Sequence, residues 1–330
     1  FAGEGIHGLS QEYRNAIDVM TTETTCLSSI WETDEKTEQY FNQHGRSDAY
    51  RCLKVDDGTY YDRCIDLDLG EVECMIALPM HPSLALPINA FKKDPKKYLK
   101  ETEDHANAQL AHKNMDLVSK VKEDGTVIVN QGVIAGCSGG TYGNIMAASA
   151  ILNDGDCGNG EFRLSIYPDS MPVYKALVEN GTVASLISTG AIFREAFCGP
   201  CFGAGDTPAN NELSIRHTTR NFPNREGSKP NEGQIASVCL MDARSIAATS
   251  RNQGVLTAAS DICHEDEKDY MCPFDASLYE KRVFNGYGKE DPDYPLHFGP
   301  NIKDWPEQPS LSSDILLKIV SHIDDPVTTT

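Results

Sequence analysis

The sequence lacks the features that proteins use to cross membranes or to bind nucleic acids. None of its apolar runs approaches the ~18 residues that a membrane-spanning helix requires. Positive charge is scarce, since 29 Lys and Arg residues face 49 Asp and Glu residues in a chain of 330, which gives a formal net charge of −20. Nucleic acids and anionic membranes bind basic surfaces. We therefore expect no nucleic acid and no membrane among the partners of this chain.

Two further absences concern processing and repetition. No Lys or Arg precedes an apolar core at the N-terminus, as it would in a secretion signal, and the chain opens with Phe1 instead of Met. We interpret the chain as a piece of a longer protein, with a cleaved leader as the alternative. No repeat of about 20–50 residues is visible, which excludes solenoids and propellers.

Cysteine, by contrast, is abundant. The 11 cysteines are odd in number and scattered, unlike the framework of a disulfide-rich secreted protein. We therefore expect reduced thiols and a cytoplasmic location. Free cysteine packs as a small hydrophobic side chain, so we expect a structural role in the core for the cysteines that have no partner at ligand spacing. These are Cys26, Cys52, Cys64, Cys74, Cys157 and Cys239.

The first part of the chain, residues 1–122, is expected to form one α/β domain. Residues 64–69 alternate between apolar and acidic side chains, which is the pattern expected of a strand with one buried face. Asp66 and Asp68 would lie on its polar face, as a solvated surface in preference to an acid–base pair. Residues 91–125 are rich in clustered charges, which favours a solvated helix or connector.

Residues 123–271 are expected to form a second α/β domain. β-branched residues predict a buried strand over residues 126–135, and a glycine-rich loop follows at 136–140. Helices are predicted over residues 144–152 and from Ser170 to Asn180. A strand over residues 235–240 leads to a third helix, capped by Asp242. Because alternating strands and helices indicate a mostly parallel sheet, we expect an α/β fold with two consecutive three-layer α/β/α units.

The last part, residues 272–330, differs in composition. Six prolines fall between residues 273 and 309, in a stretch without periodicity. This pattern predicts an extended linker, and an amphipathic helix is expected after it, from about Ser313 to His322.

The sharpest local motif is Cys198-Gly199-Pro200-Cys201, which has three interpretations. It matches the redox pair of thioredoxin-like proteins, but no proline loop follows at the required distance, since residues 231–272 contain no proline. It could be half of a zinc site, although a second pair of ligands at comparable spacing is missing. It could also supply two ligands of an iron–sulfur cluster.

The glycine-rich loop around Cys137 favours the cluster. Cys137 follows a predicted strand, where parallel α/β sheets place ligands, and it lies 61 residues before Cys198. The neighbouring glycines allow the backbone to approach a bulky cofactor. Three thiolates would leave one iron of a four-iron cube free to act as a Lewis acid. The rival interpretation, a dinucleotide phosphate cradle with Asp154 or Asp156 as the ribose acid, lacks the G-x-G-x-x-G spacing.

A basic loop follows in this acidic chain. Arg216, Arg220 and Arg225 lie among turn-forming residues. A charge-assisted hydrogen bond contributes about 1.5–3 kcal/mol, so the loop suggests capture of a carboxylic acid. Ion pairs with the surplus acids of the chain are the alternative.

In this order the motifs resemble the aconitase and isopropylmalate isomerase superfamily. The resemblance rests on Cys137, on the Cys198–Cys201 motif, on the stretch from Arg220 to Arg225, and on residues 20–31. Members of this superfamily are [4Fe–4S] hydro-lyases, which move water across a carbon–carbon double bond of a di- or tricarboxylic acid. The resemblance implies that the three cysteines hold the cluster and that Arg220 and Arg225 bind substrate carboxylates. It also gives Glu23 a catalytic role beside the cluster.

The resemblance covers nearly the whole chain but only the second and third of the family's four domains, with the start of the linker to the fourth. The first domain would supply His and Asp residues, and the fourth a serine base and a further arginine. The resemblance therefore implies the core fragment of an aconitase-like hydratase, inactive on its own. Its partners would be a small carboxylic acid and the missing N- and C-terminal domains of the same enzyme.

Three departures from the family pattern lie near the expected site. Ser138-Gly139 follows the first cysteine where the family usually has Thr-Asn. Thr219 and Val19 stand where the family has asparagines. These departures leave the identity of the hydroxy acid open. Two other functions also stay open: a degenerate, cluster-free binding scaffold, and a dithiol oxidoreductase that uses Cys198 and Cys201.

Overall fold

The computed structural model describes residues 1–110, 114–153, 155–158, 160–229, 232–263, 268–281, 291–295, 297 and 299–300. Residues 1–282 form one compact unit and residues 283–330 another. All strands and helices named below belong to the first unit. Among the described residues, no helix combines the length and the apolar character needed to cross a bilayer.

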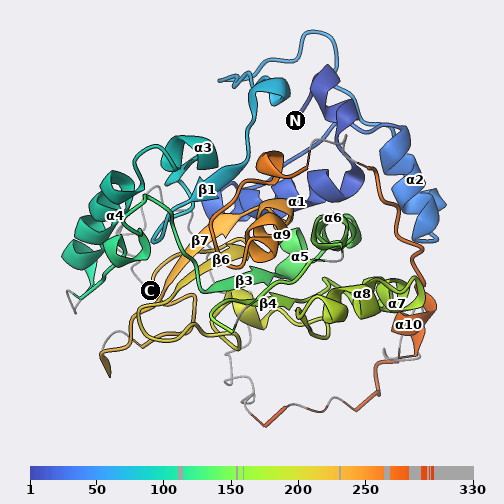
Figure 1. Cartoon of the computed structure of the whole chain (residues 1–330). Coiled ribbons are helices and arrows are strands. Elements are labelled where there is room, and N and C mark those ends of the chain that lie inside the picture. The colour runs from blue at the N-terminus through green and yellow to red at the C-terminus, as the bar shows by residue number, and fades with distance from the viewer. Residues whose placement is uncertain are drawn as a thin grey trace, which may run out of the picture. The chain divides into compact units, whose positions relative to one another are not determined.

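One seven-stranded sheet organises this unit, in the order β2-β1-β7-β6-β3-β4-β5 (Figure 1). Strands β3 to β7 run parallel to their neighbours within that group, whereas β1 pairs antiparallel with both β2 and β7. The α/β class and the mostly parallel sheet are thus confirmed. The strands span Met75–Ala77 (β1), Ala85–Pro87 (β2), Gln131–Ile134 (β3), Arg163–Ile166 (β4), Ile192–Phe193 (β5), Leu213–His217 (β6) and Ser237–Met241 (β7).

Ten α-helices surround the sheet in the described part of the chain. Two of the expected caps are present, because Ser170 Oγ accepts from the Val173 N–H and an Asp242 carboxylate oxygen accepts from the Ser245 N–H. The helices span Gln11–Thr21 (α1), Glu35–Gln43 (α2), Ile88–Phe91 (α3), Pro95–Gln109 (α4), Gly136–Gly139 (α5), Tyr142–Leu152 (α6), Met171–Glu179 (α7), Thr182–Ser188 (α8), Ala243–Arg251 (α9) and Ser277–Glu280 (α10).

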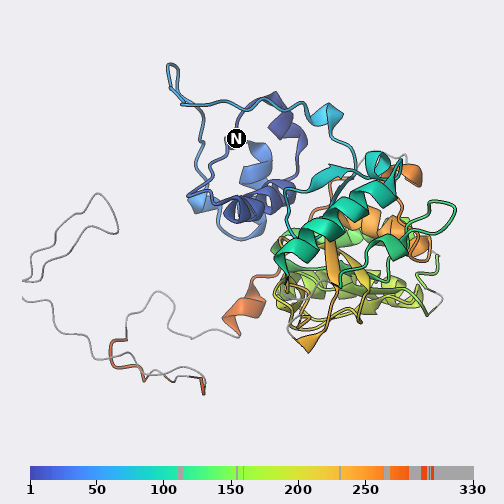
Figure 2. The same cartoon turned by 90° about the vertical axis from the view of Figure 1, so that its left-hand side faces the viewer.

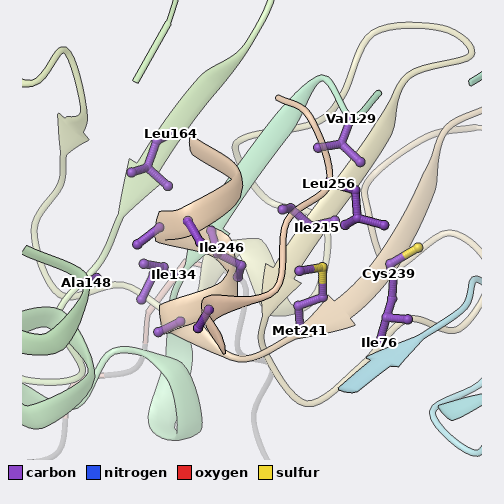
Figure 3. Close-up of a cluster of buried hydrophobic side chains, with 14 of the residues drawn as sticks. Ile76, Val129, Ile134, Ala148, Leu164, Ile215, Cys239, Met241, Ile246 and Leu256 are labelled. Carbon is purple, nitrogen blue, oxygen red and sulfur yellow. The ribbon is translucent and has the colours of Figure 1, made fainter. Parts of the chain in front are cut away.

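The core lies where α9 crosses the central strands. Helix α9 packs on α6, β3 and β6, and Figure 3 shows Ile246 of α9 near Ile134 and Ile215 of the sheet. All three side chains have no exposed surface. Full burial of such a side chain contributes roughly 1.5–3 kcal/mol, so apolar packing fixes the central strands and the loops that follow them.

The strand expected at residues 64–69 is absent, and that prediction was wrong. Residues 64–68 pair with no described strand, a 3₁₀ turn begins at Leu69, and Ile65 is 93% exposed. In Figure 2 the segment belongs to a blue trace without a strand arrow. Alternation makes a strand possible, but a strand forms only beside another strand that supplies hydrogen bonds. Asp66 and Asp68 are both exposed, as a solvated surface requires.

The expected structural role of the six unpaired cysteines is confirmed for some and wrong for others. Cys157 and Cys239 are buried and Cys74 is partly buried. The other three, Cys26, Cys52 and Cys64, are exposed. These exposed residues lie in the first 73 residues, which contain little apolar core for a thiol to enter.

Some expected bounds of helices and strands differ from those in the structure, and others stay predictions. The strand expected over residues 126–135 forms ladder pairs only from Gln131 to Ile134, and a helix is present at Pro95–Gln109 within the polar stretch. The domain boundary at residue 122 stays a prediction, and strands from both sides of it share the sheet. The terminal helix expected at residues 313–322 lies outside the described residues.

Candidate functional site

Three cysteines gather beyond the carboxyl ends of the parallel strands. Cys137 lies in α5, directly after β3, and Cys198 and Cys201 lie in a short turn between β5 and β6. Burial and the nearby Cys198 raise the pKa of Cys137. Burial, Cys198 and Cys137 together raise the pKa of Cys201 to about 12. Each thiol therefore lies within electrostatic range of the others, and their role as cluster ligands stays a prediction.

Two glycines allow this convergence. Gly136 has a φ of 77°, and a Cβ on it would lie 2.7 Å from Cys201 Sγ. A Cβ on Gly139 would lie 2.1 Å from the carbonyl oxygen of His217. Any side chain at either position would push the Cys137 turn away from β6 or from Cys201.

A buried arginine anchors the loop that carries Cys198 and Cys201. Arg216 is 1% exposed, and its guanidinium donates to the carbonyl oxygens of Pro200 and Asp206, both at 2.7 Å. It also donates to Gln131 Oε1 and Ser214 Oγ on the sheet. The loop that carries Cys201 is thereby tied to β3 and β6. The sequence placed Arg216 among candidate carboxylate ligands, whereas in the structure its donors serve the fold.

Glu23 and Arg220 meet although 197 positions separate them. Arg220 Nε donates to Glu23 Oε1 at 2.6 Å. Glu23 lies in a 3₁₀ turn directly after α1, and Arg220 follows β6. Arg220 also lowers the pKa of Cys137, against the raising effect of burial. The structure thus brings Glu23 and Arg220 together beside Cys137, and the roles that the resemblance implies for them stay predictions.

Arg225 lies five residues after Arg220, in the loop that follows β6. Its backbone N–H donates to the Phe222 carbonyl in a tight turn, and its side chain is half-buried. Within the described ranges its guanidinium makes no hydrogen bond and no ion pair. It therefore remains available for an external anion.

A cavity of about 420 Å³ adjoins Cys137 and is lined by three carboxyl groups that the sequence did not reveal, those of Glu12, Asp169 and Asp269. Burial raises the pKa of Glu12 to about 7, although its hydrogen bond from the Gly143 N–H acts in the opposite direction. Burial raises the pKa of Asp169 to about 6. Asp169 follows β4 at the sheet edge where the cysteines gather, which is the one signal that could have identified it. Glu12 carries no such signal, because only tertiary packing buries it.

The structure places all three departures from the family pattern, at Val19, Ser138 and Thr219. Val19 lines the cavity beside Cys137, and Thr219 is buried. Ser138 is also buried, and its Oγ has no hydrogen-bond partner among the described residues. Of the rival ribose acids, Asp156 accepts from the Gly158 N–H within its own turn, and Asp154 lies outside the described residues.

The donor set fits an iron–sulfur cluster better than a single ion. In the described part of the chain, no three His, Cys, Asp or Glu side chains converge closely enough to hold one metal ion. A four-iron cube binds each thiolate at a different corner, so its ligands lie further apart than those of one ion. Three neighbouring thiols, a glycine backbone at one of them and an adjacent arginine are the groups that such a cluster would use here.

The comparisons with known proteins agree on one family. A model of the Aconitase family (aconitate hydratase) matches residues 1–248. The 3-isopropylmalate dehydratase large subunit of Moorella thermoacetica is 29% identical over 263 residues, which cover 79% of this chain and 53% of that protein. The protein of the same name from Clostridium kluyveri is 26% identical over 247 residues, covering 74% and 50%.

The chain spans about half the length of the curated relatives it matches. Both the matched region and the site residues lie in its first 248 residues, where the cysteines, Glu23 and the two arginines are found. The family model covers well over half of the chain. This chain belongs to the aconitase family.

Proposed function

We propose that the chain is the cluster-binding core of a [4Fe–4S] hydro-lyase that dehydrates and rehydrates a hydroxy di- or tricarboxylic acid. The observation that carries the proposal is the Arg220–Glu23 pair beside Cys137, which unites a carboxylate-binding cation and a proton carrier next to a three-thiol site. The family match and the hydratase names of the relatives support it. A reducing cytoplasm suits the many free thiols.

Each site residue has a definite task in this proposal. Cys137, Cys198 and Cys201 would hold the cluster, whose iron without a protein ligand supplies Lewis acidity toward a substrate hydroxyl when bound. Arg220 donates to Glu23 through Nε, so its two terminal nitrogens can form a bidentate contact with a substrate carboxylate. Arg225 binds a second carboxylate. These two contacts orient the acid before any bond changes.

Glu23 carries the proton of the departing hydroxyl. Its Oε1 is fixed by Arg220, which leaves Oε2 to deliver a proton to the leaving oxygen and to recover it in the reverse direction. The base that removes the carbon-bound proton is expected from domains beyond this chain. The relatives are about twice as long as the matched region, which supports a fragment that is inactive alone and whose partners are those domains.

The experiment is anaerobic reconstitution of the chain with iron and sulfide, followed by iron counting and absorbance near ~400 nm. We expect about four irons per chain in the parent protein and a large loss in Cys137→Ser. Cys64→Ser is the matched control, because Cys64 is exposed and distant in sequence from every site residue. Equal iron binding in Cys137→Ser and the parent would refute the ligand assignment.

Two other functions were left open by the sequence. A cluster-free binding scaffold is favoured by Val19 and Thr219 at the site, and absence of iron from both parent and control proteins would support it. A dithiol oxidoreductase is less well supported, because burial raises the pKa of the Cys201 thiol to about 12 and thiol exchange requires a thiolate.

A further inference from the structure

The loop that carries Glu23 has little regular structure of its own. It follows α1 and extends over residues 22–30, up to Trp31. After the 3₁₀ turn at Thr22–Thr24 its backbone is irregular. Leu27 is fully exposed and Ile30 is 70% exposed, so neither of these apolar side chains anchors the loop. Polar contacts must therefore hold Glu23 in one place.

The contact with Arg220 is too weak to do this alone. The Arg220 side chain is 36% exposed, whereas that of Glu23 is 11% exposed. An ion pair with one partner in water gains little, because solvent screens it and both side chains lose freedom. In the proposed function the same guanidinium must also bind a substrate carboxylate. The position of Glu23 must therefore be fixed mainly from its own side of the contact.

Asp18 supplies contacts on that side. It lies in the last turn of α1, five residues before Glu23. Its Oδ1 accepts from Ser29 Oγ at 2.6 Å and from Trp31 Nε1 at 2.7 Å. One carboxylate oxygen thus ties the far end of the loop to the helix from which the loop starts. We call the three residues Asp18, Ser29 and Trp31 the Asp18 clasp.

Thr21 fixes the near end of the same loop. Its Oγ1 donates to the Asp18 carbonyl oxygen at 2.6 Å. Its own carbonyl oxygen accepts from Thr24 Oγ1 at 2.8 Å. Both ends of the loop therefore meet at the last turn of α1, and the turn that contains Glu23 lies between them.

The helix itself does not explain an acid at position 18. The carbonyl groups at the end of a helix carry partial negative charge, which disfavours an anion in the last turn. The last turn of α1 contains no basic residue that would offset this effect. Aspartate is also a poor helix former. The contacts with the loop, and not the stability of α1, therefore account for Asp18.

We propose that Asp18 is a positioning residue for Glu23. Its two bonds to the end of the loop keep the loop closed, so Glu23 Oε1 stays on Arg220 Nε. The clasp thus allows Arg220 to turn its terminal nitrogens toward a substrate without displacing Glu23. The use of Glu23 as proton carrier rests on the proposed function, whereas the clasp can be measured in the cluster-free chain.

The test follows the Arg220 Nε–H group by NMR in the cluster-free chain, with Arg220→Lys to assign its signal. The bond to Glu23 protects this proton from exchange with water, and Glu23→Ala gives the rate of the unbonded group. We expect about fivefold faster exchange in Asp18→Ala than in the parent chain, because the loop opens more often. Asp18→Asn keeps an oxygen acceptor and should stay within about twofold of the parent rate.

Asp48→Ala is the matched control, because Asp48 is an exposed aspartate of the same region outside the loop. It should leave the exchange rate unchanged. The indole N–H signal of Trp31 should shift in Asp18→Ala and stay in place in the control. Parent-like exchange in Asp18→Ala, equal acceleration in the control, or an unprotected Arg220 Nε–H in the parent would overturn the proposal. Failed iron reconstitution with an intact clasp would count against the proposed function alone.

Discussion

The residues before β1 and the residues from β1 onward are held together by different forces. In residues 1–73 only Ile6, Arg14 and Thr37 are almost fully buried, and others such as Glu12 are partly buried. In the sheet region, residues 75–260, one apolar cluster extends from Ile76 to Ala259. The sheet region is therefore stabilised by hydrophobic packing, whereas the N-terminal region depends on a few polar contacts.

The candidate site draws on both regions. The three cysteines and Arg220 extend from the sheet region, whereas Glu23 comes from the N-terminal region. In the proposed function, the cluster ligands and the proton carrier would therefore come from regions that are held together by different forces. Substitutions that test the two regions separately should reveal this difference.

The largest effect is expected from Arg216→Met in the sheet region. The change removes the donor for the Pro200 carbonyl, for which no other donor is found among the described residues, whereas the Asp206 carbonyl keeps its bond from Gln131 Nε2. We expect a loss of about 3–5 kcal/mol in the free energy of unfolding, measured by urea titration. Arg194→Met is the control, because Arg194 is half-exposed and its pair with Asp206 is 3.9 Å long. Similar losses in both variants would contradict the anchoring role.

A somewhat smaller and local effect is expected from Arg14→Met. Arg14 is 1% exposed and donates to both carboxylate oxygens of Asp34, which also caps α2, and this arrangement holds the pKa of Asp34 well below its usual range. We expect a loss of about 2–4 kcal/mol confined to the N-terminal region. Hydrogen exchange should accelerate in α1 and α2 and stay slow in β3 and β6. Equal acceleration in the strands would mean that the two regions unfold as one.

The pH dependence of stability tests the contact between the regions at Glu12. Its pKa is about 7 in the folded chain against 4.5 ordinarily, so the folded state retains a proton that the unfolded state releases. The free energy of unfolding should therefore decrease as pH rises from 5 to 8, by up to about 3 kcal/mol. Glu12→Gln should flatten this slope, and the exposed Glu38→Gln should not. An unaltered slope in Glu12→Gln would place the effect elsewhere.

The smallest effect on stability is expected from Glu23→Gln. The Glu23–Arg220 pair joins the two regions, but the Arg220 side chain is 36% exposed and solvent screens the interaction. We expect a loss below about 1 kcal/mol in thermal or urea unfolding. A loss comparable to that of Arg14→Met would show that this pair, and not the Arg14 network, holds the N-terminal region in place.

The sequence predicts the sheet region better than the N-terminal region for a physical reason. The caps at Ser170 and Asp242 and the α/β alternation depend on neighbours in sequence, and they are found where expected. The pattern at residues 64–69 has the right periodicity, but no strand lies beside it. Strand formation depends on a distant partner, which periodicity does not reveal.

The same distinction applies to the candidate site. The glycine positions around Cys137 indicate a close backbone approach, and the structure shows it at Gly136. The anchoring contact of Arg216 and the raised pKa of Glu12 could not be predicted, because both depend on segments that are far away in sequence. The family resemblance assigned Glu23 and Arg220 to one site, but it did not predict their direct contact, and no local pattern links two residues 197 positions apart.

The length of that separation has a consequence for synthesis in the cell. During translation Glu23 emerges 197 residues before Arg220, and at ~5–20 residues per second this is a delay of roughly 10–40 s. Strands β6 and β7, which form the sheet's centre, also come late in the chain. The first 73 residues therefore remain without the completed sheet region on which they pack. Chaperones can bind the exposed Ile65 and Leu67 throughout that time.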